Sequence, residues 1–296
     1  MNRRHFITAT TLSLSALAGC TGGGNDSSQS SQTTAETETE QEGSTETTST
    51  RERTTEEGEA EFELVSSDVP EKVELGEEFA ISAEIKNVGS APGEFDSAIS
   101  AKTASSDWQQ AGDAETEEIE PGETATWTSE TVTFEYLMRV TYRIEKLEQE
   151  FTIQAVSRKL SLGESFTTPE GVVVSVQRFD LKSYYEYEGY DGSTEQKRAG
   201  DGKRWAFVYL KAENTAGQSN FIPLETDVNL IARNSQYDQK YVNKEENRYE
   251  GGEVEAGIVR KGWLAYEIPN DLSKTDLTVA WSDRDGTGEW SVRWSA

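Results

Sequence analysis

From about residue 61 to its end, this chain carries its apolar side chains in short runs of strand length. In one run every second position is apolar, at Phe79, Ile81, Ala83 and Ile85. A period of two is typical of a strand with one buried face, whereas a helix repeats every 3.6 residues. Turn signals rich in Gly separate the runs, and short strands at regular spacing predict a sandwich or barrel. We therefore expect an all-β protein.

Two sandwiches are expected, because the runs fill two stretches that each have the length of a sandwich domain. Residues 61–156 form the first stretch and residues 157–296 the second. The strongest predicted strand is 205–211, which is rich in aromatic and β-branched residues. Trp290 and Trp294 share one strand face near the end of the chain, and core packing is the expected role of such residues.

The turns of the first stretch resemble those of a known family. Residues 85–89 read Ile-Lys-Asn-Val-Gly, and residues 120–124 read Glu-Pro-Gly-Glu-Thr. This order is similar to that of CARDB and related immunoglobulin-like extracellular adhesion modules. The resemblance implies a CARDB-like domain over 61–156. Its landmarks are structural turns, so it supports a fold and not an activity.

The second stretch has landmarks of its own. Residues 202–205, the Asn214 turn and the strand 262–269 resemble telokin-like, immunoglobulin-like extracellular domains of bacterial and archaeal lipoproteins. The resemblance implies a telokin-like domain over 157–296, with no assigned activity. The predicted fold class is thus two tandem immunoglobulin-like β-sandwich domains behind a disordered acidic linker.

The N-terminus has the layout of an export signal. Arg3 and Arg4 precede an apolar stretch over 6–18, and small residues lead to Cys20. The stretch is shorter than the ~20 apolar residues that a membrane-spanning helix needs. It resembles a twin-arginine motif followed by a lipobox, which implies that residues 1–20 are an export signal and that Cys20 carries lipid. A general secretion route stays open, because a charged pair begins most export signals.

Residues 21–60 consist mostly of Gly, Ser, Thr, Gln and Glu. Such a segment cannot bury enough apolar surface to offset its chain entropy. We expect it to be a disordered linker that separates the folded domains from the membrane.

The residue types that are missing exclude several kinds of site. His5 is the only histidine and Cys20 the only cysteine in the chain. After the signal there is no partner for Ser-His-Asp or Cys-His catalysis, no histidine or cysteine zinc site and no disulfide. We expect no catalytic residue, no metal site and no cofactor.

The chain is strongly acidic, with 55 acidic and 28 basic residues and a net charge of −27. Residues 61–296 alone hold 45 acidic and 24 basic side chains, a net charge of −21. Such a surface repels itself, and salt at about 1 M shortens the Debye length to about 3 Å. The pattern resembles haloarchaeal surface lipoproteins, although a merely soluble acidic protein is the alternative. The charge argues against nucleic acid as a partner.

Four tyrosines, Tyr184, Tyr185, Tyr187 and Tyr190, alternate with acidic residues before a Gly-rich loop. An exposed group of this kind would bind sugars or peptides, because Tyr offers a rigid contact area with a polar tip. The favoured alternative is a strand in which Tyr185 and Tyr187 point inward before an Asp-Gly turn.

Residues 283–289 gather carboxylates around a Gly turn, which suggests a calcium loop. The segment lacks the twelve-residue length and the fifth-position ligand of an EF-hand. A hairpin turn between two strands is therefore favoured.

These features predict a lipid-anchored, extracellular protein at the outer face of the cell membrane with a non-catalytic binding or structural role. Its expected partners are the membrane, through lipid on Cys20, and a surface protein or carbohydrate. The alternatives are an accessory lipoprotein subunit of a membrane transport or secretion complex and, third, a carboxylate-dependent hydrolase.

Overall fold

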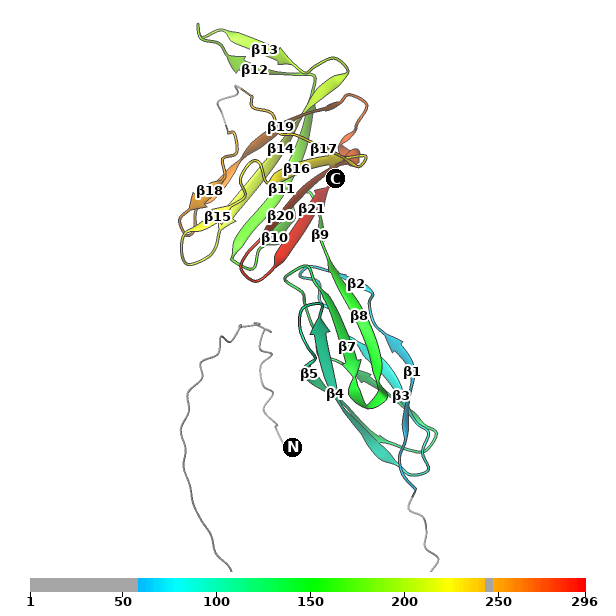
Figure 1. The fold of residues 1–296 in the computed structure, drawn as a ribbon. Helices are drawn as coiled ribbons and strands as arrows, with labels where there is room; N and C mark the ends of the chain where they lie inside the picture. The colour runs from blue at the N-terminus through cyan, green and yellow to red at the C-terminus, as the bar shows by residue number, and fades with distance from the viewer. Residues whose placement is uncertain (1–57, 243–246) are drawn as a thin grey trace, which may run out of the picture. The chain divides into compact units, whose positions relative to one another are not determined.

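The computed structural model describes residues 58–242 and 247–296 (Figure 1). Their regular structure is β apart from two short 3-10 helices, η1 (Glu145–Leu147) and η2 (Lys274–Asp276), which confirms the predicted all-β class. The predicted export signal with Arg3, Arg4 and Cys20 lies outside the described residues, as does the linker 21–60 except for its last three residues. Among the described residues, no helix is long and apolar enough to cross a membrane.

The first sandwich is built from two sheets within residues 62–156. One sheet has the order β1-β3-β6 and the other β2-β8-β7-β4-β5. All neighbours are antiparallel except β2 and β8. The strands are β1 (Phe62–Asp68), β2 (Lys72–Glu74), β3 (Ser82–Asn87), β4 (Gly93–Thr103), β5 (Gln109–Ile119), β6 (Thr124–Thr128), β7 (Arg139–Ile144) and β8 (Gln149–Val156).

The second sandwich follows at once, since β8 ends at Val156 and β9 begins at Arg158. Its sheets have the orders β10-β11-β14-β19 and β17-β16-β20-β21-β9, and two smaller two-stranded sheets, the hairpin β12–β13 and the pair β15–β18, are added to them. The strands are β9 (Arg158–Ser161), β10 (Ser165–Thr167), β11 (Val172–Lys182), β12 (Tyr184–Glu188), β13 (Thr194–Arg198), β14 (Lys203–Asn214), β15 (Asn220–Ile222), β16 (Val228–Ala232), β17 (Ser235–Tyr237), β18 (Gly252–Val254), β19 (Val259–Pro269), β20 (Leu277–Arg284) and β21 (Glu289–Ser295).

Strand β14 is buried on both faces. Its Val208 and Leu210 belong to the main core, whereas Trp205 and Phe207 belong to a second cluster on the opposite face. The period of two thus sends every second side chain to a different core. Trp294 lies in the main core, fully buried, and donates a hydrogen bond from Nε1 to the carbonyl of Glu164 at 3.0 Å.

A fully buried asparagine ends a central strand of the first sandwich. Asn87 is the last residue of β3 and is 0% exposed. Its Nδ2 donates to the carbonyls of Ala91 and Ile119, each at 2.8 Å. Its Oδ1 accepts the N–H of Gly89 at 2.9 Å. The same oxygen also accepts the N–H of Glu61 at 3.3 Å, so that one side chain satisfies four backbone groups at this corner.

The second sandwich repeats this corner. Asn214 ends β14 and is also 0% exposed. Its Nδ2 donates to the carbonyls of Gln218 at 2.8 Å and Val254 at 3.0 Å, and its Oδ1 accepts the N–H of Ala216 at 3.0 Å. The sequence offsets match as well: in both corners one acceptor is four residues on, and the donor is two residues on.

The backbone carbonyl of each asparagine also accepts a hydrogen bond from a glycine in a turn. The carbonyl of Asn87 accepts the N–H of Gly122 at 2.7 Å, and that of Asn214 accepts the N–H of Gly257 at 2.8 Å. Both glycines have a left-handed φ, +84° and +76°, which residues with a Cβ rarely adopt. The two sandwiches therefore share one corner design, which we call the asparagine corner.

Candidate functional site

The four tyrosines lie on the hairpin β12–β13, which Figure 1 shows at one end of the second sandwich, beyond the strands of its sheets. Strand β12 pairs with β13 in antiparallel register, and residues 189–193 make the turn. The structure divides the four. Tyr185 is 6% exposed, Tyr187 is half-buried, and Tyr184 and Tyr190 are exposed.

The buried tyrosine of the hairpin, Tyr185, belongs to the second cluster. We call this cluster the aromatic layer, and its members are Tyr185, Trp205, Phe207, Val242, Trp263 and Ala265. The rings of Tyr185 and Trp205 meet edge to face with centroids 5.2 Å apart, and those of Phe207 and Trp263 do so at 5.4 Å. The Nε1 of Trp205 donates to the carbonyl of Lys197 on β13 at 3.2 Å. Edge-to-face pairs add to the stability that burial alone provides. The aromatic layer therefore holds the hairpin against the sheet.

On the solvent-facing side of the hairpin, an exposed tyrosine lies next to an arginine. The guanidinium of Arg198 lies over the ring of Tyr184 with its carbon 5.7 Å from the centroid, a cation–π geometry. Tyr190, at the turn, is fully exposed. The hydroxyl of Tyr187 donates to the Glu195 carboxylate, and this hydrogen bond raises the pKa of Tyr187. The hairpin thus presents two tyrosines and an arginine on a fixed base.

A third exposed tyrosine, Tyr241, lies on a segment that also covers the aromatic layer. Tyr241 is exposed, and the guanidinium of Arg248 lies 4.6 Å from its ring centroid. Arg248 forms a β-bridge with Trp263, and Val242 packs within the layer. The sequence offered no pattern around Tyr241 that marks it as a surface residue of this kind.

The carboxylate-rich segment 283–289 is the turn of the hairpin between β20 and β21, as the favoured interpretation of the sequence expected. Its Asp285 uses both carboxylate oxygens within the protein. Oδ1 accepts the N–H groups of Thr287 at 2.6 Å and Gly288 at 2.9 Å, and Oδ2 accepts the hydroxyl of Tyr136 at 2.7 Å. Burial raises the pKa of Asp285, but these hydrogen bonds outweigh it and lower the pKa. In the part of the chain that the structure describes, no three His, Cys, Asp or Glu residues are grouped to hold a metal.

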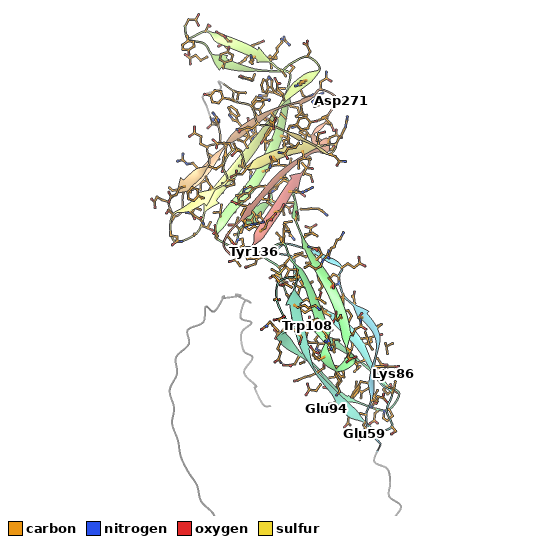
Figure 2. All side chains as sticks on the ribbon, viewed as in Figure 1. Glu59, Lys86, Glu94, Trp108, Tyr136 and Asp271 are labelled. Atoms are coloured by element: carbon orange, nitrogen blue, oxygen red, sulfur yellow. The ribbon has the colours of Figure 1, made fainter. Side chains whose placement is uncertain are left out.

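Tyr136, labelled in Figure 2, connects this turn to the first sandwich. Burial and the hydrogen bond to Asp285 raise the pKa of Tyr136 to about 12. Gly288 packs against the ring so closely that a Cβ there would lie 2.7 Å from it. The N–H of Leu137 also donates to the carbonyl of Glu289 at 2.7 Å. The Asp285 carboxylate therefore has a structural role, because it holds the turn to a residue far away in sequence.

Comparison with known proteins gives structural likenesses only. The sequence matches no protein-family model, and no curated protein matches it either. The solved yjhA protein from Bacillus subtilis is 16% identical, covers 46% of this chain and 99% of its own, and has a TM-score of 0.35. A secreted protein from Mycobacterium tuberculosis, MPT63, is 14% identical, covers 48% of this chain and 98% of its own, and has a TM-score of 0.34. An uncharacterised β-sandwich protein from Clostridium difficile is 9% identical, covers 47% of this chain and 94% of its own, and has a TM-score of 0.30. The sheets of the chain itself establish its β-sandwich fold.

Proposed function

We propose that this chain is a lipid-anchored protein at the outer face of the cell membrane, with a non-catalytic binding role carried by the hairpin β12–β13. The observation that supports it is the divided tyrosine group, in which Tyr185 fixes the hairpin while Tyr184 and Tyr190 face solvent. Rigid tyrosines lose little conformational entropy on contact, which suits them to sugar or protein partners. The partner class is a surface carbohydrate or a surface protein.

Membrane attachment is assigned to lipid on Cys20, after export directed by Arg3 and Arg4. The argument is the sequence layout of charged pair, short apolar stretch and small residues before a single cysteine. The twin-arginine route, the CARDB-like character of 61–156 and the telokin-like character of 157–296 are parts of this proposal. They are supported by the resemblances in sequence.

Replacing Cys20 with Ser should release the protein from the membrane into the medium, because the sulfur that carries the lipid is gone. Fractionation of cells into membrane and medium measures this. The matched control changes Arg3 and Arg4 to Lys, which keeps the charge and should hold the chain inside the cell if the twin-arginine route is used. Retention of Cys20→Ser on the membrane would contradict the anchor.

A double change of Tyr184 and Tyr190 to Ser tests the binding role. Both side chains are exposed, so folding should be unaffected, whereas material that co-purifies with the protein from salt-solubilised membranes should be lost. The control is Tyr241→Ser, which removes an exposed tyrosine that lies on another segment. A stoichiometric membrane protein that stays bound to the double variant would instead favour an accessory subunit of a transport or secretion complex.

The acidic surface supports a further part of the proposal, that the protein works at high salt. Residues 61–296 carry a net charge of −21. On the exposed face of the β4–β5 pair, Glu94 faces Glu118 and Asp96 faces Glu115 across the strands. Like charges directly opposite each other destabilise a sheet unless salt screens them.

A further inference from the structure

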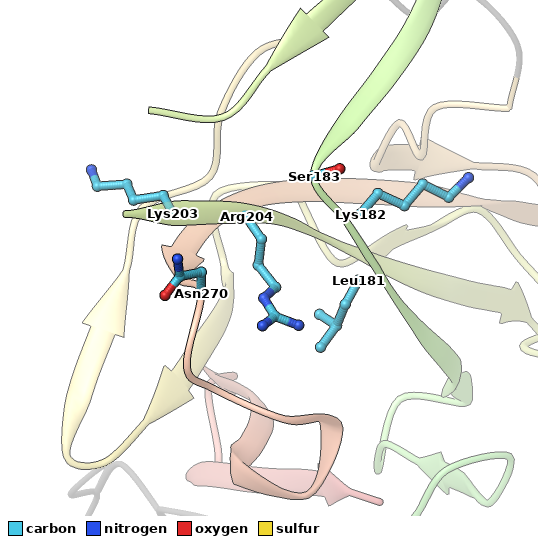
Figure 3. A pocket seen from close by; sticks show the side chains of 6 residues that line it. All are labelled: Leu181, Lys182, Ser183, Lys203, Arg204 and Asn270. Atoms are coloured by element: carbon cyan, nitrogen blue, oxygen red, sulfur yellow. The ribbon is translucent and has the colours of Figure 1, made fainter. Parts of the chain in front are cut away.

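A pocket of about 240 Å³ opens at the base of the β12–β13 hairpin, where the chain leaves β11 and returns into β14. Its lining consists of Leu181, Lys182, Ser183, Lys203, Arg204 and Asn270 (Figure 3). Three of these six residues are cationic and none is acidic. The chain as a whole has 55 acidic and 28 basic residues, so this local balance is the reverse of the overall one.

Arg204 is the central group of the pocket. It is half-buried and lies on β14 in register with the buried Ile268, on the strand face that continues into the main core at Ala206. Figure 3 shows its side chain extending between Asn270 and Leu181. Among the described residues, its guanidinium has no hydrogen-bond or ion-pair partner. A partly desolvated arginine without a carboxylate is costly, and the cost is recovered when an anion binds.

The other polar groups of the lining can also serve an anion. The Nδ2 of Asn270 and the hydroxyl of Ser183 are donors, and the side chains of both are exposed. Lys203 has one weak ion pair, with its Nζ 3.9 Å from Glu267. Lys182 and Lys203 extend away from Arg204 in Figure 3, so they add positive potential at the rim and are not ligands in this arrangement.

From this lining we infer a binding site for a compact oxyanion, a sulfate, phosphate or carboxylate group, with the Arg204 guanidinium as its principal ligand. The planar fork of Arg matches two oxygens of such a group, which a lysine ammonium does not. The net charge of the chain repels anions at long range, but at about 1 M salt the Debye length is about 3 Å, and the contacts within the pocket then decide binding. The oxyanion is either a free ion or an acidic group on a sugar.

Calorimetric titration of the purified full-length protein at constant ionic strength tests the inference, with sodium sulfate, sodium glucuronate and glucose as probes. If sulfate binds and glucuronate does not, the ligand is a free oxyanion. If both bind, the site recognises an acidic group whether it is a free ion or part of a sugar. Both outcomes support the site. Glucose should not bind at the pocket. Failure of both anions to bind with saturation would overturn the inference.

The variant Arg204→Gln should weaken anion binding by about tenfold or more, the range expected for a lost charge-assisted hydrogen bond. It should unfold at the same temperature as the parent, because the guanidinium has no partner to lose. The anion affinity of Arg204→Lys should lie between those of the parent and Arg204→Gln. The control Arg293→Gln makes the same charge change at an exposed residue of β21, outside the lining and away from the hairpin, and should bind as the parent does. Equal binding by Arg204→Gln and the parent would assign the anion to another place and refute the site.

Discussion

Replacing Asn214 with Ala is expected to lower the free energy of unfolding of the second sandwich by about 3–5 kcal/mol. The change leaves the carbonyls of Gln218 and Val254 and the N–H of Ala216 without their partner. Each buried backbone group that loses its hydrogen bond costs about 1–3 kcal/mol, and the empty volume of the side chain adds to this. Water can reach part of the turn and replace some of these hydrogen bonds, so the total loss of stability stays below the sum of the largest single costs.

Asn87→Ala should have a similar effect on the first sandwich, because the asparagine corner there has the three corresponding hydrogen bonds and one more, from the N–H of Glu61. Denaturant unfolding measures both, followed by tryptophan fluorescence. Trp127 reports on the first sandwich, and buried Trp281 and Trp294 report on the second. If the sandwiches unfold separately, each variant should shift a different transition.

Asn229→Ala is the matched control for both corner variants. Asn229 is half-buried on β16, and its hydrogen bonds to Gln236 and Asp227 lie near solvent, which can replace them. A loss of less than about 1 kcal/mol is expected there. If the corner variants lost no more than this control, the asparagine corner would be an incidental arrangement without a stabilising role.

Lowering sodium chloride from about 2 M to about 0.1 M is expected to destabilise residues 61–296 by several kcal/mol, because the Debye length rises to about 10 Å and the acidic surface then repels itself. The measurement is the unfolding temperature across a salt series at constant pH. Potassium chloride at equal ionic strength should give the same result if screening is the cause. An unfolding temperature that does not change over this range would rule out the high-salt proposal.

The strand pair β4–β5 provides a test within the protein. Changing Glu115 and Glu118 to Gln removes the repulsion with Asp96 and Glu94, so the variant should lose part of the salt dependence. Glu94 is labelled in Figure 2. The control is Glu150→Gln, because Glu150 faces Arg143, a cation, across the β7–β8 pair. It should leave the salt dependence unchanged or increase it slightly.

Strands with a clear apolar pattern could be predicted from the sequence, and those without one could not. The run 205–211 lies within β14, and the run 290–294 lies within β21. Strand β5 escaped prediction, because only Ala114 and Ile119 of its eleven residues are buried. It is an edge strand that pairs with β4 alone, so one neighbour and not its own pattern holds it in place.

The candidate sites divide in the same way. Sequence alone identified the tyrosine group and the carboxylates of 283–289 as unusual. It did not identify Arg204 as a site, although the adjacent cations Lys203 and Arg204 in so acidic a chain were a usable signal. Their convergence with Asn270 depends on the pairing of β14 with β19, which no local pattern predicts.

By itself, the sequence determined the all-β class, the glycine turn at 120–124, and the exclusion of histidine and cysteine chemistry after residue 20. These follow from residue types and short-range periodicity, which act within a few residues of each position. Only the tertiary structure decided that Trp205 and Phe207 cover Tyr185, that Asp285 accepts a hydrogen bond from Tyr136, and that Arg204 lies in a pocket without a carboxylate. The physical reason is that a period of two fixes opposite faces of a strand, but what covers each face comes from segments distant in the chain.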